Sequence, residues 1–301
     1  MPRIAARYRE YAPCEALRGA VRAFFSFSPA DANAAPGRRI TREILFGEGD
    51  SFCSPMFADG HVSIVFSFPR ICRTGGLWHP SPAGSHADVL GAMTVAGPTS
   101  SDGRDEIWGA YLRPAGAPRC TGVPAADLTD RIVALDELWG PAASELIAEL
   151  SEQNEAAERI DRIESALLRR TSQARTAATA LNVPGLAAWV MRRQGGVTVE
   201  RMGAAAGVSR QHLTRVFRES VGVTPKLYCR LARFQSGLVH AGSGSKVDWA
   251  REAVQMGYAD QSHMIAEFRR FSSLTPGQLA SQNWFHPFIE RARAASQTHP
   301  R

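Results

Sequence analysis

The stretch VTVERMGAAAGVSRQHLTRVFRESVG, residues 197–222, decides the fold of the C-terminal third of this chain. It predicts a short helix, a tight turn at Gly207-Val208, and a second helix that begins after Ser209. The Ser209 hydroxyl can accept a hydrogen bond from the otherwise unpaired amides of that helix's first turn. Apolar residues recur at positions i, i+3 and i+4 of the second helix and predict one buried face; they are Leu213, Val216 and Phe217.

The opposite face of the second helix is polar: Gln211, Thr214, Arg215 and Arg218. A helix with such a face, held by a short helix across a turn that contains glycine, is the arrangement that reading the DNA major groove requires.

The same pattern recurs about fifty residues later, in VDWAREAVQMGYADQSHMIAEFRRFSSLTPGQ, residues 247–278. Gly257 corresponds to Gly207 and Phe268 to Phe217. The sequence after the second helix also repeats, since Ser-Leu-Thr-Pro at 273–276 follows the pattern of Gly-Val-Thr-Pro at 222–225. The chain therefore contains a duplicated helix-turn-helix.

This region resembles the double helix-turn-helix DNA-binding domain of AraC/XylS-type transcriptional regulators. The stretches GVSRQHLTRVFRESVGVTPKLY and GYADQSHMIAEFRRFSSLTPGQ carry the resemblance. It implies a transcriptional regulator, more often an activator, that binds double-stranded promoter or operator DNA and contacts RNA polymerase when it activates. It also implies an N-terminal domain with a cupin-like barrel that binds a small-molecule effector or forms a homodimer.

The charge distribution supports a DNA-binding C-terminal part. Residues 185–285 contain 13 Lys/Arg and 6 Asp/Glu, whereas residues 1–184 contain 19 and 22. The positive charge is thus concentrated in the segment with the duplicated motif, as expected for a protein that binds the phosphate backbone.

The N-terminal half has apolar, β-branched or aromatic runs bounded by turn residues, at 20–28, 39–46, 61–68, 89–97 and 106–114. These runs predict short strands in a small barrel or sandwich. Residues 125–170 have apolar residues at helical spacing and predict helices that either pack on their own domain or pair with a second subunit. The predicted fold class is therefore α+β with two domains, β-rich and then all-α.

Four segments follow from this reading. Residues 1–170 form the sensing or dimerisation domain with its trailing helices, and residues 171–184, which lack periodicity, form a linker. Residues 185–285 form the DNA-binding domain, in which 226–240 is a long joining helix, and residues 286–301 form a basic tail.

Base-reading residues are expected on both second helices. In the first copy they are Arg210, Gln211, Thr214 and Arg215, and in the second copy they are Gln261 and Ser262. Arg218 and Arg269, further along each helix, are expected to contact phosphate.

The second copy departs from the first on its reading face. Ala266 and Ile265 stand where family members commonly have an arginine or another polar residue, and an apolar side chain cannot read a guanine edge. We therefore expect the first helix to provide most of the base specificity. Glu252 stands where the first copy has Met202, a position expected to pack inward. We therefore expect that the helix is slightly rotated or that Glu252 has a partner near Arg251 or His263.

The sequence offers no catalytic constellation and no closely spaced His-x-His with a following Glu, so we expect no catalytic residue, no metal and no cofactor. The lone histidines are His61, His79 and His86, and the five cysteines are scattered with no Cys-x-x-Cys spacing. Trp78 and Trp108 are candidates for an effector pocket, although aromatic residues pack cores more often than they line pockets.

Two other interpretations stay open for the N-terminal half. It could be a cupin-like metalloenzyme domain tethered to DNA, for which bound metal would be diagnostic, or it could bind another protein instead of an effector. The sequence shows no apolar run of membrane-spanning length and no signal peptide, so we expect a cytoplasmic protein.

Overall fold

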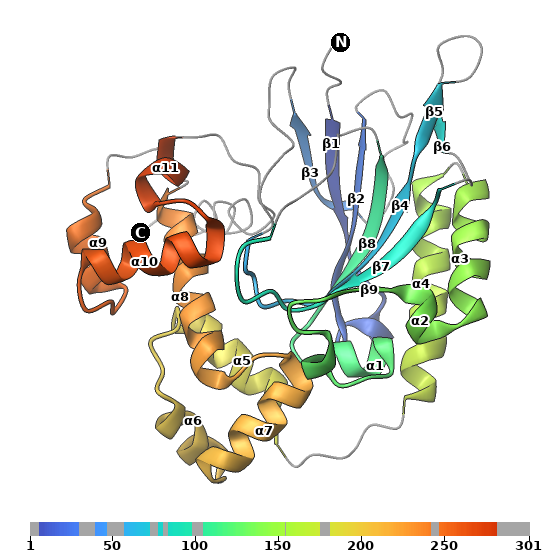
Figure 1. The fold of residues 1–301 in the computed structure, drawn as a ribbon. Helices are drawn as coiled ribbons and strands as arrows, with labels where there is room; N and C mark the ends of the chain where they lie inside the picture. Colours follow the sequence, from blue (N-terminus) through green and yellow to red (C-terminus); the bar gives the residue numbers. More distant parts are fainter. Residues whose placement is uncertain are drawn as a thin grey trace.

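The computed structural model describes residues 6–29, 40–46, 57–72, 78–80, 84–97, 105–153, 155–174, 181–241 and 247–281. Two units are visible in Figure 1, a sheet with its covering helices and a group of helices beside it. We call residues 6–174 the sheet unit and residues 181–281 the helical unit.

The sheet unit is built on one antiparallel sheet in the order β3-β1-β2-β8-β4-β7-β9. Its strands are β1 (Ala6–Tyr11), β2 (Val21–Pro29), β3 (Ile40–Phe46), β4 (Ser63–Phe68), β7 (His86–Leu90), β8 (Glu106–Leu112) and β9 (Ile132–Ala134). Strands β5 (Arg70–Cys72) and β6 (Trp78–Pro80) form a separate pair.

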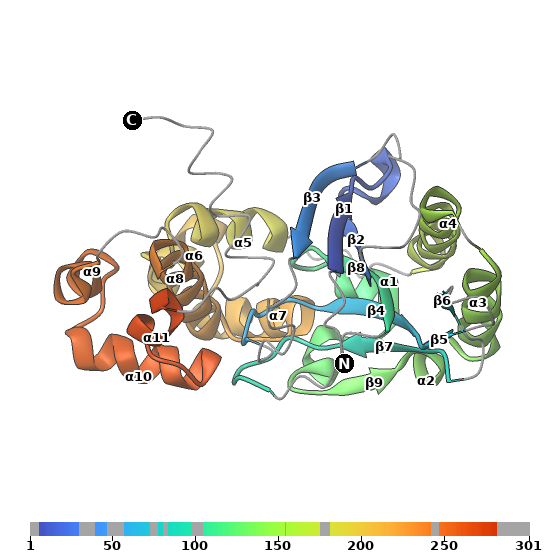
Figure 2. The same ribbon diagram turned by 90° about the horizontal axis from the view of Figure 1, so that it is seen from above.

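Helices α2 (Leu135–Trp139), α3 (Pro141–Glu152) and α4 (Ala156–Gln173) cover one face of this sheet. Helix α1 (Ala117–Thr121), which packs on α4, and the 3-10 helices η1 (Glu15–Leu17) and η2 (Ala125–Leu128) complete the unit. Figures 1 and 2 both place α3 and α4 at the side of the sheet away from the helical unit. The amphipathic stripes of these two helices share a hydrophobic core with the strands, which includes Phe24, Phe66, Leu150 and Ile163.

A buried ion pair joins α4 to the sheet. Arg159 is 2% exposed, and its Nη1 donates to Glu106 Oε1 over 2.7 Å. The Trp108 indole also donates to Glu106, over 2.9 Å, and Arg159 lies over the Trp108 ring.

The expected barrel is not formed by the described strands, because the sheet ends at β3 and β9 without closing. Core packing on its covered face is completed by α3 and α4 instead of by further strands. The coarser prediction of a β-rich part followed by an all-helical part is confirmed.

The helical unit is organised around the long helix α8 (Pro225–Ala241), which joins two helix-turn-helix motifs. Before it lie α5 (Val183–Arg192), α6 (Val199–Ala206) and α7 (Arg210–Val221), and after it lie α9 (Trp249–Gln255), α10 (Gln261–Ser272) and α11 (Pro276–Ser281). The α8 side chains of Tyr228, Leu231, Phe234 and Leu238 are each at most 1% exposed. The helix is therefore the centre of the core of this unit.

The two units are in direct contact at α8 and α10. The Ala58 amide donates to the Phe271 carbonyl over 2.8 Å, and the Gln235 side chain donates to the Asp59 carbonyl over 2.7 Å. The rings of Phe57 and Phe234 meet edge to face, with centroids 6.2 Å apart. The segment 57–59 of the sheet unit is thus docked on the joining helix and on the end of α10.

Several sequence-based boundaries shift in the structure. The run predicted as a strand over 89–97 is paired at 86–90 as β7, and the helix expected after 125 is a short 3-10 turn followed by strand β9. Within the helical stretch predicted over 125–170, α2 ends at Gly140 and α3 begins directly after it. Helix α4 extends to Gln173, into the expected linker. The linker residues 175–180 and the tail 286–301 lie outside the described residues, and the domain boundaries stay predictions.

Candidate nucleic-acid interface

The first helix-turn-helix forms as its local sequence predicts. Ser209 caps α7, with its hydroxyl oxygen accepting from the His212 amide over 3.2 Å. Gly207 ends α6 in the left-handed region with φ of 64°, a conformation that glycine adopts without steric cost. The inward side chains Leu213 and Phe217 are fully buried. These features orient the outer face of α7 towards solvent.

The outer face of α7 has the polar residues expected of it, and Arg210, Gln211, Arg215 and Arg218 are exposed. Thr214 is only half-buried, and its hydroxyl donates to the Arg210 carbonyl over 2.8 Å. Thr214 thus donates its hydroxyl hydrogen within the helix. The long side chains that can donate hydrogen bonds to DNA from this face are those of the arginines and Gln211.

Two exposed ion pairs hold these arginines. Arg215 Nη1 lies 3.1 Å from Glu219 Oε1, with the two side chains 60% and 49% exposed. Arg210 Nη1 lies 3.8 Å from Glu200 Oε1. Exposed pairs of this kind contribute at most about 1 kcal/mol, so either guanidinium can exchange its carboxylate for a DNA phosphate or base at small cost.

The second helix-turn-helix has the same framework. Asp260 caps α10, with its carboxylate accepting from the His263 amide over 2.8 Å, and Met264 and Phe268 are fully buried. The outward side chains Gln261, Ser262, Ala266 and Arg269 are exposed, while Ile265 is half-buried. The position that Arg215 occupies in α7 is taken by Ala266 in α10.

The partner that the structure gives Glu252 is His240, a residue that the sequence did not suggest. The Glu252 carboxylate lies 3.8 Å from Nε2 of His240 near the end of α8, and Ala253 fills the buried position beside it. The half-buried Glu252 therefore faces the joining helix.

The sheet unit lies beside the reading face of α7. A cavity of about 830 Å³ is lined on one side by Gln211, Arg215 and Arg218 of α7 and on the other by Ala126 and Asp127 of η2. Nothing in the sequence of η2 indicates this position, because the contact joins segments far apart in the chain.

A hydrogen bond fixes η2 against the end of α7. Thr129 Oγ1 donates to the Gly222 carbonyl over 2.6 Å, and Gly222 itself has φ of 94°. A Cβ atom at Gly222 would lie 3.1 Å from the Ala125 carbonyl oxygen and 3.2 Å from the Ala92 Cβ. The two units are therefore closely packed at this point.

Of the two candidate effector residues, Trp108 and Trp78, the structure describes the side chain of Trp108 alone. Trp108 is 4% exposed and packs in the core of the sheet unit, where its ring stacks with Tyr11 at 6.1 Å between centroids. The Trp78 backbone belongs to β6, but its side chain lies outside the described part of the structure, as does that of His79.

Within the part of the chain that the structure describes, no group of three or more His, Cys, Asp and Glu residues is placed to hold a metal ion. None of the described helices is long and apolar enough to cross a membrane.

Two parts of the chain match families of known proteins. Residues 202–282 match the family model of a helix-turn-helix domain, and residues 9–134 match a family described only as a domain of unknown function. No curated protein matches the chain.

Similar solved structures include ToxT from Vibrio cholerae at 1.65 Å, with 11% identity, a TM-score of 0.41, and coverage of 77% of this chain and 95% of that one. ToxT with bound unsaturated fatty acid has 11% identity and a TM-score of 0.39, with coverage of 76% and 89%.

The duplicated, capped helix pairs with exposed polar second helices and the family match together define a helix-turn-helix DNA-binding protein. More specifically, the chain is a transcriptional regulator with a C-terminal helix-turn-helix domain of the AraC type, preceded by a β-rich N-terminal part.

Proposed function

We propose that the two motifs divide the work of DNA recognition, with α7 reading bases and α10 anchoring the backbone. The observation that carries the proposal is the difference between their outer faces. Arg215 projects from α7 where the exposed Ala266 stands on α10. A guanidinium can donate two hydrogen bonds to a guanine edge, whereas a methyl group can only touch a thymine methyl.

In this proposal Arg210, Gln211 and Arg215 contact base edges, and Arg218 contacts phosphate. On the second helix Gln261 and Ser262 reach the groove, and Arg269 contacts phosphate. Thr214 has a smaller role in base reading than its position in the sequence predicts, because its hydroxyl donates within α7.

We also propose that the sheet unit controls access to α7. Because η2 lines the same cavity as Arg215 and Arg218, a DNA duplex that takes α7 into its major groove meets η2 at this edge. Binding then requires η2 to move away and the Thr129–Gly222 hydrogen bond to open. The AraC/XylS resemblance implies that a small-molecule effector or a second copy of the chain binds the sheet unit. Such binding would change the proportion of protein in which η2 has moved away from α7.

The direction of regulation follows the resemblance alone: the proposal is an activator that brings RNA polymerase to its promoter. Regulators of this type have no catalytic role, and the proposal assigns the chain no enzymatic activity and no cofactor.

The test uses the full-length protein and a DNA site obtained by in vitro selection. Wild-type protein should protect this site in a footprint, and its log affinity should fall linearly with log salt concentration. Arg215→Ala should flatten the preference among single-base variants of the site, while Arg269→Ala should weaken binding to all variants equally. Absence of salt-sensitive binding to any DNA would overturn the proposed function.

A further inference from the structure

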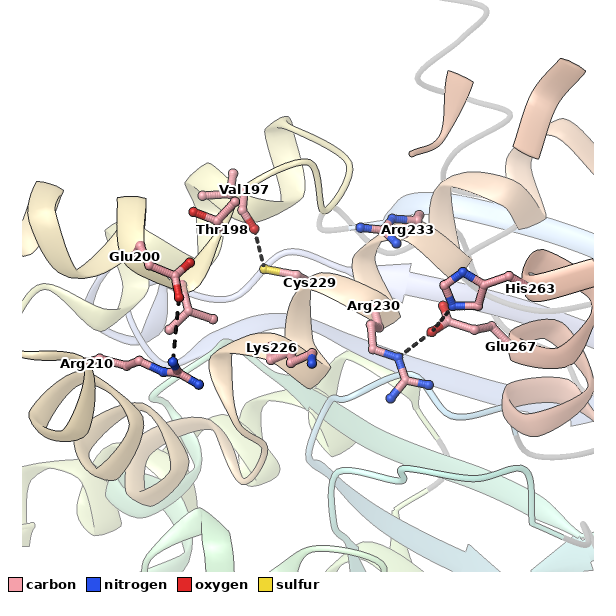
Figure 3. Close-up of a pocket in the computed structure, with 11 residues that line it drawn as sticks. Val197, Thr198, Glu200, Arg210, Lys226, Cys229, Arg230, Arg233, His263 and Glu267 are labelled. Atoms are coloured by element: carbon pink, nitrogen blue, oxygen red, sulfur yellow. Dashed lines mark hydrogen bonds and ion pairs between the residues drawn. The ribbon is translucent and has the colours of Figure 1, made fainter. Parts of the chain in front are cut away.

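A second cavity lies between the two helix-turn-helix motifs, next to the reading face of α7. Its volume is about 540 Å³, and its floor is the face of α8 that carries Lys226, Arg230 and Arg233. Arg210, the first residue of α7, borders it on one side, and His263 and Glu267 of α10 border it on the other. Figure 3 shows Lys226 between Arg210 and Arg230 along this floor.

The side chains of this cavity have an excess of positive charge. Four permanent cations, Arg210, Lys226, Arg230 and Arg233, face only two carboxylates, those of Glu200 and Glu267. Neutralisation is incomplete even when both carboxylates are paired, so a bound anion would be attracted by the remaining charge.

The buried carboxylate holds one of these cations in a fixed orientation. Glu267 is 3% exposed and accepts a hydrogen bond from Nε of Arg230, which also lies over the Phe271 ring. In Figure 3 the two terminal nitrogens of Arg230 point away from Glu267. These nitrogens are the atoms that bind phosphate oxygens in pairs, so the ion pair leaves the binding edge of Arg230 available.

The position of the cavity relates it to DNA. Arg210 lines both this cavity and the one at the α7 reading face, so the two surfaces are continuous. In a duplex read by α7 and α10 about one helical turn apart, the segment between the two major-groove contacts has to pass over the gap between the motifs. That segment presents its sugar-phosphate backbone to the protein.

The spacing of the cations matches that backbone. Lys226, Arg230 and Arg233 are at positions i, i+4 and i+7 of α8, so they follow one face of the helix over about 10 Å. One DNA strand carries a phosphate about every 3.4 Å along the duplex axis, so the row is long enough for about three phosphates.

We propose that this cavity binds the DNA backbone between the two half-sites, which makes the joining helix α8 a third DNA-contacting element. The proposal rests on the proposed function, because it takes both motifs to bind one duplex. Contacts from α8 carry no base information, but they fix the separation of the two half-sites that the protein accepts.

The experiment compares full-length wild type with Lys226→Gln, Arg233→Gln and the double variant on the selected site. Arg169→Gln is the matched control, since it removes an equal charge from the exposed face of α4 in the sheet unit. Each lost phosphate contact should make the negative slope of log affinity against log salt shallower by about 0.9. Base preference should stay unchanged. Phosphate ethylation between the half-sites should inhibit binding of wild type and of the Arg169→Gln control, but not of the double variant.

The possible results are distinct. If wild type shows no salt-sensitive DNA binding, the proposed function fails. If wild type binds but Lys226→Gln and Arg233→Gln keep its salt slope and its central ethylation interference, this inference alone is overturned. If inorganic pyrophosphate raises the melting temperature of wild type but not of the double variant, and central ethylation has no effect on DNA binding, the cavity is a site for free anions and the DNA-backbone assignment is wrong.

Discussion

Replacing Thr129 with valine should make the protein bind DNA more tightly, because Thr129 holds η2 beside the reading face of α7. Valine keeps the shape of threonine but removes the hydroxyl that donates to the Gly222 carbonyl over 2.6 Å. Gly222 is buried, so its carbonyl then lies without this partner in the docked arrangement. Loss of such a buried hydrogen bond costs about 1–3 kcal/mol.

That cost falls on the docked arrangement and not on the DNA-bound one, in which the bond is already open. If the docked state dominates in free protein, a destabilisation of 1–3 kcal/mol raises apparent DNA affinity by about 5-fold to 150-fold. The gain is smaller when the open state is already well populated.

Fluorescence anisotropy with the selected DNA site measures this change. Thr171→Val is the matched control, because Thr171 Oγ1 donates to the Leu168 carbonyl over 3.1 Å within α4 of the sheet unit. The Thr171→Val protein should unfold more readily than wild type but bind DNA with unchanged affinity. Equal or weaker DNA binding by a folded Thr129→Val protein would refute the view that η2 docking restrains α7.

Three further predictions concern packing and charge. Gly222→Ala and Gly207→Ala both place a side chain at positive φ, which costs about 1–2 kcal/mol at either site. Only Gly222 lies against the sheet unit, so Gly222→Ala should lower the melting temperature more than Gly207→Ala does. Arg159→Met leaves Glu106 buried without its cation and should lower unfolding stability by about 3–5 kcal/mol in urea titrations, which an unchanged midpoint would contradict. Burial raises the pKa of Asp59 from 3.8 to about 7, with the hydrogen bond from the backbone amide of residue 61 as a smaller opposing effect. Because the folded state then holds the proton more tightly, stability should fall as pH rises from about 4 to 7, by at most about 1.4 kcal/mol per pH unit, and Asp59→Asn should abolish this dependence in urea titrations at pH 5 and 8.

The helix-turn-helix motifs could be predicted because their signals are local. Ser209 and Gly207 are the cap and turn residues of one short segment, and the burial of Leu213 and Phe217 follows from spacing within a single helix. The duplication repeated these signals, so the joining helix was constrained from both ends. Its expected span of 226–240 differs from the observed one by one residue at each end.

The sheet unit was harder to predict because its strands do not follow simple alternation. Strand β1 has the sequence ARYREY, and Arg9 and Glu10 are both buried although their charge predicts exposure. The three-residue strand β9 follows a 3-10 turn, so the segment resembled one helix. Trp108 was a candidate for a pocket, but partners from distant segments, Tyr11 and Arg159, enclose it in the core.

The contacts between the units could not be predicted at all. Thr129 and Gly222 are 93 positions apart, and neither belongs to a motif that indicates the other. The same is true of the cavity between the motifs, in which the partner of Arg230 is a glutamate 37 positions later on α10. Such contacts depend on how whole helices pack, which a periodic pattern does not specify.

The most direct test of the division of labour between α7 and α10 is in vitro selection of DNA sites by full-length wild type, Arg215→Ala and Arg269→Ala. The account predicts a bipartite wild-type site with one well-defined half and one degenerate half. Arg215→Ala should erase base preference at one or more positions of the defined half, and Arg269→Ala should select the same site with lower affinity. Two equally defined halves, or loss of base preference in Arg269→Ala but not in Arg215→Ala, would contradict it.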